Sequence, residues 1–488
     1  MSEPAVNETL LGKLRAYGES DMYPLHMPGH KRRLAPRELE SVIGMDITEI
    51  EGFDNLHDAR GVLKEAQEYA ARVYGSEETS FVINGSSAGL LAAITAACRQ
   101  GGKIMAARNC HRSVYNAIEI DQLEPVYIYP HINSSYGISE GISGQDAARL
   151  LAENEGIQAI VLPSPTFDGV VSDIGGICRA AHAEGIPVIV DEAHGAHLHF
   201  SGYFPKSALE MGADIVIQSV HKTLPALTQA SIIHMNGPLV DRVRLRRMLT
   251  VFQSSSPSYL LMGSIDGCMH MLSESGGKLY EEYTEMLDSV RRSLGAMKNL
   301  HLFGEEDLEY CGSIGYDRSK LLVSSAGTPV TGDWIYRKLL DSFHIQMEME
   351  AADYVLGITA VGDDRKGLAR VRDAFLEIDS EAGGCVAKTG AVSRQFIAQL
   401  PAPKTAMSIY EAGLRKCGRV SLEDAPGRIM GDYIYLYPPG IPLITPGEQI
   451  DEEAAAVIRY WLESGMRVTG VDSEEKICVI DSQEACLS

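Results

Sequence analysis

The sequence lacks several signatures by which function is most easily recognised. Its nine cysteines form no CxxC pair, and their irregular spacing argues against a disulfide framework or a zinc site. No apolar run approaches the length of a membrane span, and the first twenty residues lack the basic start and apolar core of a signal peptide. We therefore expect a cytoplasmic protein without a metal site or a membrane segment.

Excess positive charge is also missing. The formal net charge is −23 over 488 residues, so the field of the chain disfavours binding to nucleic acid or to anionic membranes. The glycine-containing turn at residues 84–87 matches neither GxGxxG nor GxxxxGK[ST], which leaves dinucleotide and P-loop sites poorly supported. With 45% hydrophobic residues, the chain is an ordinary globular protein long enough for more than one domain. The negative field would mildly attract a cationic small molecule, although solubility alone also explains it.

Short apolar segments alternate with helical segments from about residue 50 to 290. This alternation predicts an α/β fold with a large, mostly parallel sheet covered on both faces. A polar, Gly-rich stretch at residues 379–389 resembles a linker. We expect four parts: an N-terminal arm (1–50), a large domain (51–290), a small α+β domain (291–380) and a C-terminal domain (381–488).

A lysine and an aspartate each follow an apolar segment. Lys222 comes just after residues 213–218, and Asp191 ends the segment 186–190. Open α/β sheets bind ligands at the carboxyl ends of their strands. An amine nucleophile, and a carboxylate that holds a pyridinium nitrogen, are what pyridoxal 5′-phosphate (PLP) requires of a protein. Lys222 and Asp191 therefore predict a PLP site.

A phosphate cradle is predicted in the turn that precedes a helix expected from Ala88. Gly85 permits a tight turn, and the backbone N–H groups of Ser86 and Ser87 then point outward where the helix dipole favours an anion. Ser219 and His221 flank Lys222, and both can donate hydrogen bonds to phosphate oxygens. Each of these residues taken alone has an ordinary structural explanation.

Two histidines complete the predicted site. His111 follows a strand and begins a helix, where its ring can lie on a bound pyridine ring. His194 can hold the ring hydroxyl of the cofactor or orient Asp191. The cradle, the stacking ring, the pyridinium partner and the lysine occur in this chain order, each at a strand end, which favours one PLP site over separate structural roles.

The motifs of the chain resemble those of a known family. The sequence is similar to the Orn/Lys/Arg decarboxylases of bacteria in their short form, which are PLP-dependent enzymes of fold type I, the aspartate-aminotransferase-like fold. The resemblance rests on these segments: Met27-Pro28-Gly29-His30-Lys31, Asp54-Asn55-Leu56-His57, Arg108-Asn109-Cys110-His111, Asp191-Glu192-Ala193-His194-Gly195-Ala196-His197, Ser219-Val220-His221-Lys222, Ser255-Ser256-Pro257-Ser258-Tyr259, Gly427-Arg428-Ile429 and Tyr437-Pro438-Pro439-Gly440-Ile441-Pro442.

The resemblance implies a role for each predicted site residue. Lys222 would bind the cofactor aldehyde covalently, Asp191 would hold the pyridine nitrogen, and His111 would stack on the ring. Residues around Ser255 and Ser256 would reach the cofactor of a neighbouring subunit, which implies a homodimer or higher homo-oligomer with shared active sites. The catalytic set is Lys222, Asp191, His111 and His194, and the cofactor-binding set adds Gly85, Ser86, Ser87, Ser219, His221, Ser255 and Ser256.

The resemblance also implies the reaction, an α-decarboxylation of arginine first, then of lysine or ornithine, to an amine that is a polyamine or its precursor. Glu348 and Glu350 would recognise the distal cation of the substrate. The chain departs from the family pattern at Phe167, usually tyrosine, and at Ala351, usually an acid. The alternatives are an aminotransferase of the same fold and a non-catalytic homologue.

Overall fold

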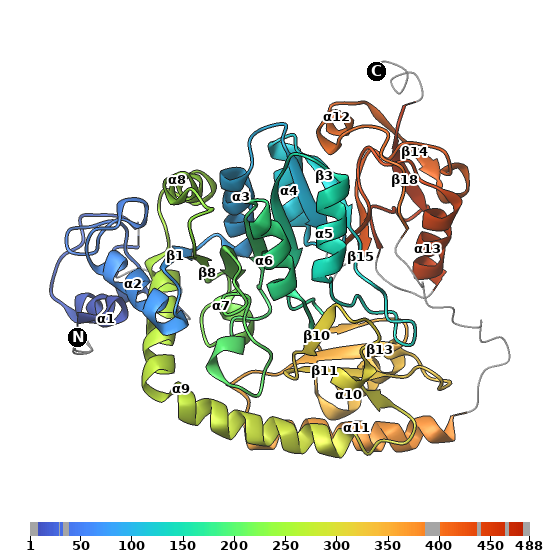
Figure 1. Ribbon diagram of the computed structural model, residues 1–488. Helices are drawn as coiled ribbons and strands as arrows, with labels where there is room; N and C mark the ends of the chain where they lie inside the picture. The colour runs from blue at the N-terminus through green and yellow to red at the C-terminus, as the bar shows by residue number, and fades with distance from the viewer. Residues whose placement is uncertain are drawn as a thin grey trace. The chain divides into compact units, whose positions relative to one another are not determined.

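The computed structural model describes residues 8–28, 30–32, 39–385, 401–436, 441–463 and 468–481. The chain folds into two compact units, Met1–Ala97 with Pro187–Glu282, and Cys98–Ile186 with Tyr283–Ser488 (Figure 1). Two parts of the sequence motifs, Gly29 and residues 437–440, lie outside the described residues.

The first unit contains four hydrogen-bonded strands. Their order is β1 (Glu78–Val82), β8 (Ser231–Met235), β7 (Ile215–Gln218), β6 (Val188–Asp191). Strand β8 is antiparallel to both β1 and β7, whereas β7 and β6 are parallel. The three strands β1, β7 and β6 therefore run in one direction, and their carboxyl ends lie at one edge of the sheet.

The first unit also contains helices that come before, between and after these strands in the chain. They are α1 (Leu10–Glu19), α2 (Val62–Tyr74), α3 (Gly85–Ala97), α7 (Val220–Thr223), α8 (Arg242–Phe252) and the first part of α9 (Tyr259–Leu294), with short helices η3 (Ile43–Met45), η4 (Leu56–Asp58) and η5 (Leu198–Phe200). Helix α3 packs against β7 and β8 on one side and α8 on the other (Figure 1). A Cβ atom on Gly89 would lie 3.1 Å from Cγ2 of Ile217, so glycine allows α3 to approach the sheet closely.

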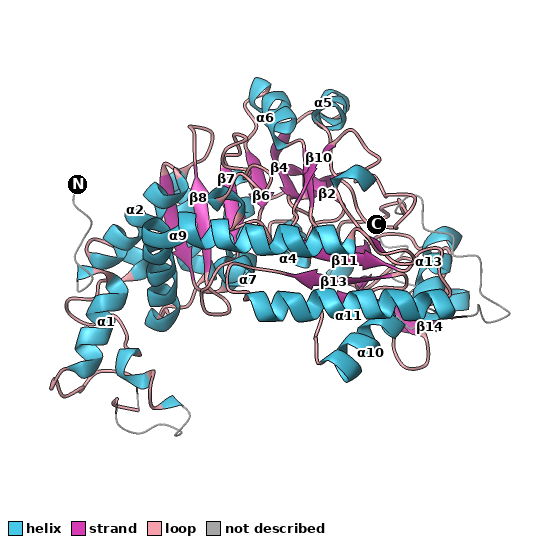
Figure 2. Cartoon of the chain, turned by 90° about the horizontal axis from the view of Figure 1, so that it is seen from below, coloured by secondary structure: helices cyan, strands magenta, loops and turns pink. Residues whose placement is uncertain are grey.

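The second unit contains the parallel strands β4 (Ile157–Pro163), β2 (Lys103–Ala107) and β3 (Glu124–Ile128), with helices α4 (Arg112–Ile120), α5 (Gly144–Glu153) and α6 (Ile174–Ala183). An antiparallel sheet follows, in the order β12 (Met349–Glu350), β13 (Tyr354–Ile358), β11 (Lys320–Ser324), β9 (His301–Leu302). Strands β5 (Val170–Ser172) and β10 (Ser313–Tyr316) form a separate pair. Helices α10 (Gly332–Phe343) and α11 (Arg365–Gly384) lie beside β13 and β11 (Figure 2).

The C-terminal part of the second unit has its own apolar core. Its elements are α12 (Ile409–Gly413), β14 (Cys417–Ser421), β15 (Ile434–Leu436), β16 (Ile441–Ile444), α13 (Glu452–Glu463), β17 (Val468–Thr469) and β18 (Lys476–Ile480), with the short helix η7 (Leu422–Asp424). The short helix η6 (Glu305–Asp307) lies earlier in the chain, after β9. Met430, Ile444, Ile458 and Val479 are buried together between the strands and α13.

The linker expected from residue 379 is wrong for its first six residues, because helix α11 continues to Gly384. The carboxylate of Asp379 accepts hydrogen bonds from the backbone N–H groups of Lys298, Asn299 and Leu300 at 2.8–3.0 Å. This anchoring, together with the burial of Ala382, holds a polar, Gly-rich sequence in the helix. Residues 386–389 lie outside the described part of the chain.

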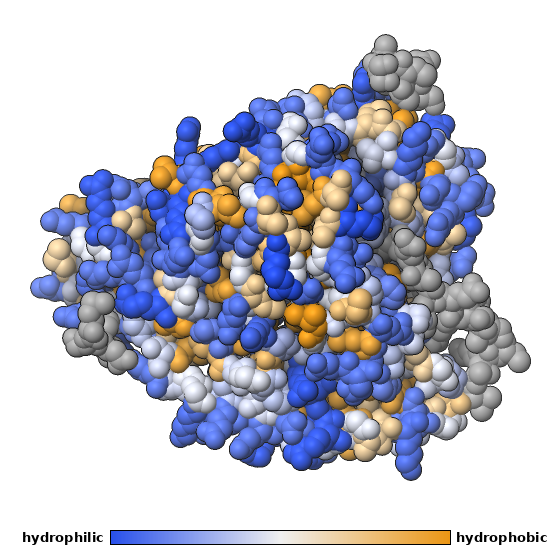
Figure 3. Space-filling view, in the orientation of Figure 1, coloured by the Kyte–Doolittle hydropathy of each residue, from blue (hydrophilic) through white to orange (hydrophobic). Residues whose placement is uncertain are grey.

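Hydrophilic side chains dominate the face seen in Figure 3, with apolar side chains scattered among them. A denser apolar group occurs in the irregular segment after α1, where Met22, Tyr23, Leu25 and Met27 are all at least 60% exposed. Within the described residues, none of the helices has both the length and the apolar character needed to span a membrane.

Candidate active site

The turn after β1 has the geometry of an anion cradle. Gly85 begins helix α3 with a φ of +76°, a conformation that favours glycine. Ser86 is buried, and its hydroxyl lies 2.7 Å from the hydroxyl of Ser219 and 3.3 Å from that of Ser231. Ser87 is exposed at the first turn of the helix. Hydroxyl groups and unpaired helix N–H groups thus occur together where the helix dipole favours negative charge.

The segment after β7 carries three predicted residues. Ser219 makes no side-chain cap for the short helix α7, because its hydroxyl bonds to Ser86. His221 donates from Nδ1 to the carbonyl of Ala230 at 2.9 Å. Burial lowers the pKa of His221, and the nearby charge of Lys222 lowers it further, although the Ala230 carbonyl opposes the shift. A neutral His221 presents a lone pair at Nε2, so it must take up a proton before that atom can donate to a phosphate.

Asp191 ends β6 and is buried to 8% exposure. Its Oδ1 atom accepts from the N–H of Ala193 at 3.1 Å, and among the described residues Oδ2 receives no hydrogen bond. The β6–β7 register pairs Asp191 with Ile217, five residues before Lys222. The carboxylate therefore has an oxygen available for a ligand N–H group at the edge where Lys222 follows.

His194 and Lys222 are in direct contact. Their Nε2 and Nζ atoms lie 2.9 Å apart, and the Lys222 side chain is exposed rather than sealed in the core. The first unit thus brings together two groups, Ser86 with Ser219 and His194 with Lys222, at the edge where β1, β7 and β6 end. Asp191 occupies the same edge.

The serine loop, residues 253–256, is hydrogen-bonded to the turn at residues 83–84 that leads into the phosphate cradle. Gln253 Oε1 accepts from the N–H of Ile83 at 2.8 Å, and Asn84 Oδ1 accepts from the N–H of Ser254 at 3.4 Å. His57 Nε2 lies 2.8 Å from the carbonyl oxygen of Ser254. Ser255 and Ser256 are exposed at the tip of this loop, and the structure shows no contact between them and the other predicted residues of the described chain.

Three predicted residues belong to the second unit. His111 is the N-cap of α4 and accepts from the N–H of Ser113 at 3.2 Å through Nδ1, which fixes the ring at the end of β2. Glu348 and Glu350 are exposed, and they alternate with the buried side chains of Met347 and Met349. The two acids therefore lie on the same face of the β12 segment.

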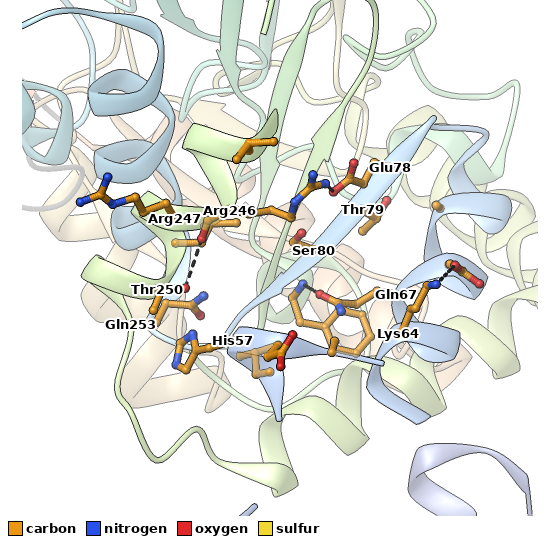
Figure 4. Close-up of a pocket in the computed structure, with 18 of the residues that line it drawn as sticks. His57, Lys64, Gln67, Glu78, Thr79, Ser80, Arg246, Arg247, Thr250 and Gln253 are labelled. Atoms are coloured by element: carbon orange, nitrogen blue, oxygen red, sulfur yellow. Dashed lines mark hydrogen bonds and ion pairs between the residues drawn. The ribbon is translucent and has the colours of Figure 1, made fainter. Parts of the chain in front are cut away.

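A cavity of about 680 Å³ lies beside β1 in the first unit and contains none of the predicted site residues. Its walls include His57, Arg246 and Gln253 (Figure 4). Gln67 Oε1 accepts from the N–H of Phe81 at 2.9 Å, so this side chain satisfies a backbone donor of β1 that its partner strand does not use. The cavity is thus a feature of the strand edge, separate from the carboxyl-end site.

The site residues fit PLP by their chemistry. Hydroxyl groups and helix N–H groups suit a phosphate dianion, a carboxylate suits a pyridinium nitrogen, and a lysine amine suits an aldehyde.

The sequence did not reveal one group of buried polar side chains, which starts with Glu192, the residue after Asp191, and crosses the sheet away from the site. The only signal for it was the presence of Gln218 and His234 within otherwise apolar strands.

Comparison with known proteins was consistent across sequence and structure. Residues 9–310 match the family described as Orn/Lys/Arg decarboxylase, major domain, and residues 389–467 match the C-terminal domain of the same family. Arginine decarboxylase of Bacillus subtilis is 33% identical over 481 residues, which cover 97% of each chain. Constitutive lysine decarboxylase of Escherichia coli is 25% identical and covers 87% of this chain and 70% of that protein.

Solved structures with the same fold include two kinds of enzyme. The lysine decarboxylase of Francisella novicida superimposes with a TM-score of 0.83 at 20% identity, over 97% of this chain and 81% of that one. Ureidoglycine-glyoxylate aminotransferase of Bacillus subtilis superimposes with a TM-score of 0.51 at 12% identity, over 67% of this chain and 86% of that one. The expected α/β fold of type I is confirmed.

Proposed function

Because the chain belongs to the Orn/Lys/Arg decarboxylase family, we propose that it is a PLP-dependent enzyme that removes the α-carboxyl group of a basic amino acid. The observation that carries this proposal is the meeting of the Ser86–Ser219 and His194–Lys222 pairs at one sheet edge with Asp191. The amine that remains after CO₂ leaves would be a polyamine or its precursor.

Each residue has a role in holding the cofactor or the substrate. Ser86, Ser87, Ser219 and His221 hold the phosphate, Asp191 keeps the pyridine nitrogen protonated, and Lys222 binds the aldehyde carbon. From the family resemblance we propose that His111 stacks on the ring. His194 holds the ring hydroxyl of the cofactor or orients Asp191, and its contact with Nζ of Lys222 adds a role in orienting that amine. When bound, PLP supplies an electron sink for the charge that develops at the substrate Cα as the carboxylate leaves.

The protein must also orient the scissile bond and return a proton. The residues that bind the two ends of the substrate must hold the Cα–carboxylate bond perpendicular to the ring. The contact between Lys222 and His194 provides two groups that can hold and move a proton between Nζ and Nε2. Either atom is a candidate for the proton returned to Cα.

Arginine is the first choice of substrate, followed by lysine and ornithine. The relative with 33% identity is an arginine decarboxylase, whereas the lysine decarboxylase has 25% identity. Glu348 and Glu350, exposed on one face of their segment, would bind the distal cation.

We further propose a cytoplasmic homodimer or higher homo-oligomer with shared active sites. The exposed Ser255 and Ser256 would reach the cofactor of the partner, and the exposed apolar group at residues 22–27 would be buried by a second copy. We also retain the four-part division at residues 50, 290 and 380 as a proposal, and the family matches over 9–310 and 389–467 support its separate C-terminal domain.

The decisive experiment incubates the purified protein with PLP and, separately, with arginine, lysine and ornithine. We expect release of CO₂ and formation of the matching amine by mass spectrometry, with arginine the fastest. Formation of a keto acid without CO₂ would identify an aminotransferase. A protein with no turnover, no visible absorbance of bound cofactor and no lysine labelled by borohydride would be a non-catalytic homologue.

A further inference from the structure

Four buried polar side chains form a hydrogen-bonded chain across the sheet of the first unit. Thr79 Oγ1 lies 2.7 Å from His234 Nδ1, and His234 Nε2 lies 3.1 Å from Gln218 Oε1. Gln218 Nε2 donates to Glu192 Oε2 at 2.7 Å. These residues come from β1, β8, β7 and the position after β6, and each is at most 3% exposed. Buried polar groups are costly unless bonded, so the chain needs every one of its members.

The carboxylate of Glu192 sets the direction of every bond in the chain. The ionised carboxyl only accepts, and with it the amide nitrogen of Gln218 faces Glu192 and its oxygen faces His234, as the structure has them. His234 Nε2 is then the donor and Nδ1 the acceptor, so the hydroxyl of Thr79 donates to Nδ1. Burial lowers the pKa of His234 to about 3, which agrees with a neutral ring.

Glu192 also fixes the segment that follows η5. Its Oε1 atom accepts from the N–H of Ala208 at 2.6 Å, and its Oε2 atom accepts from the hydroxyl of Ser207 at 2.9 Å. Three donors therefore converge on one carboxylate. Burial raises the pKa of Glu192 to about 7, while its bonds to Ala208, Gln218 and Ser207 oppose the shift.

The main chain of Glu192 lies at the centre of the turn that carries two site residues. Its N–H donates to the carbonyl of Ile217 in β7 at 2.9 Å, and its own carbonyl accepts from the N–H of Gly195 at 2.9 Å. Asp191 precedes Glu192 directly, and His194 lies between Glu192 and Gly195. Movement of Glu192 would therefore move both the Asp191 carboxylate and the His194 ring.

We propose that Glu192 is a positioning residue, which holds Asp191 against the cofactor nitrogen and His194 against Lys222 by anchoring their turn to the buried chain. This inference rests on the proposed function, because it presumes that Asp191 and Lys222 bind PLP. Glu192 touches neither of them with its own side chain among the contacts that the structure shows, and it acts through the turn.

The test uses Glu192→Gln in the full-length, PLP-loaded protein. An amide has one acceptor atom, so if its oxygen keeps the N–H of Ala208, its nitrogen faces the Gln218 amide, which must turn over and reverse the hydrogen bonds of the buried chain. We expect kcat to fall about 10- to 100-fold, by analogy with the loss seen when a residue that orients a metal ligand is replaced, with KM nearly unchanged. We also expect the pH titration of the bound cofactor's visible absorbance to shift, and the apoprotein to bind PLP more weakly.

Glu210→Gln is the matched control. Glu210 accepts from the N–H of Ser207 at 3.0 Å, so it lies on the same segment, but it is exposed and outside the buried chain. We expect its kcat, its titration and its thermal unfolding to match those of the unaltered protein. An equal loss in Glu210→Gln would overturn the assignment to Glu192.

A rescue variant separates positioning from a general loss of stability. In Glu192→Gln/Gln218→Glu, the new carboxylate at 218 accepts from His234 and from the amide at 192, whose oxygen accepts from Ala208. We expect this exchange to restore the temperature of thermal unfolding and most of kcat. If Glu192→Gln alone does not fold, the exchange variant by itself tests whether Glu192 positions the turn.

Two results would overturn the inference: a wild-type kcat and titration in Glu192→Gln, or an exchange variant with restored unfolding but no restored kcat. Failure of the proposed function would look different, because the unaltered protein itself would then show neither bound-cofactor absorbance nor CO₂ release.

Discussion

The amine of Lys222 lies 2.9 Å from Nε2 of His194, although 28 residues separate them in the sequence. At this distance the two nitrogen atoms share one hydrogen bond, in which the lysine amine can donate to Nε2 when that ring nitrogen carries no proton. The contact exists because β6 and β7 are parallel neighbours, so the turns that follow them lie side by side. It places a titratable partner beside the proposed nucleophile.

Lys222→Ala should abolish both covalent cofactor binding and turnover. Without the amine no group can bond the aldehyde carbon, and the phosphate contacts alone would retain PLP weakly. Borohydride reduction followed by peptide mass spectrometry should label the unaltered protein at residue 222 and leave the variant unlabelled. The exposed Lys206 supplies the control, since Lys206→Ala should keep both label and activity. Decarboxylation that survives in Lys222→Ala would contradict the proposed role.

Asp191→Asn should bind the cofactor but lose most of the rate. The amide oxygen can still accept from the N–H of Ala193, so the turn is preserved, whereas the negative charge that keeps the ring nitrogen protonated is gone. We expect kcat to fall by about 10²- to 10³-fold, as for loss of one electrostatic group in an active site. Steady-state kinetics and the visible spectrum of the bound cofactor measure this change. An unaltered kcat would show that Asp191 does not face the ring.

The sequence allowed better prediction of the strands, and of the order of the site residues along the chain, than of the contacts between side chains. Strands β7 and β6 and the polar residues that follow them were recognised because apolar segments end at polar ones. Helix α3 begins at Gly85 rather than at Ala88, since a glycine in the left-handed region starts the first turn. The predicted cradle therefore belongs to the helix itself.

Contacts between distant segments could not be predicted in the same way. The Ser86–Ser219 bond spans 133 residues and depends on β8 lying between β1 and β7, an arrangement that no local pattern encodes. In the sequence, Gln218 is a polar residue at the end of one apolar strand and His234 a polar residue within another, and neither position indicates a contact. Their role emerges only when the sheet order brings them to Glu192.

A buried ion pair in the second unit should make a large, coupled contribution to stability. The Arg108 guanidinium donates to Glu448 Oε2 at 2.9 Å, and the two side chains are 1% and 2% exposed. Arg108 also donates to the carbonyl of Leu443 at 2.9 Å, so it links the end of β2 to the C-terminal part. Removal of one partner leaves a buried charge without compensation.

We expect Arg108→Met to lower the free energy of unfolding by about 3–5 kcal/mol, the range seen when one partner of a buried pair is removed. Glu448→Gln should also destabilise, and the double variant should lose less than the two single losses combined, by roughly 1–3 kcal/mol. Denaturant unfolding of all four proteins gives this double-mutant cycle. Simple additivity would show that the pair is not coupled.

Acid should destabilise the first unit through His234. Burial, together with the charge of the nearby His199, lowers the pKa of this histidine from 6.5 to about 3 in the folded protein. Between these values the unfolded chain binds a proton that the folded chain does not, so stability is full above pH 6.5 and falls as the pH approaches 3. The contribution is roughly 5 kcal/mol at most.

Removing the histidine should therefore flatten this part of the pH profile. His234→Gln retains an amide that can bond to Gln218 but has no proton to gain, so the midpoint of denaturant unfolding should change less between pH 6.5 and 4 than in the unaltered protein. His182→Gln is the control, because His182 is exposed on α6 and its replacement should leave the slope unchanged. Equal slopes in His234→Gln and the unaltered protein would assign the acid sensitivity to other groups, and the neutral state of His234 that orients the buried chain would lose its support.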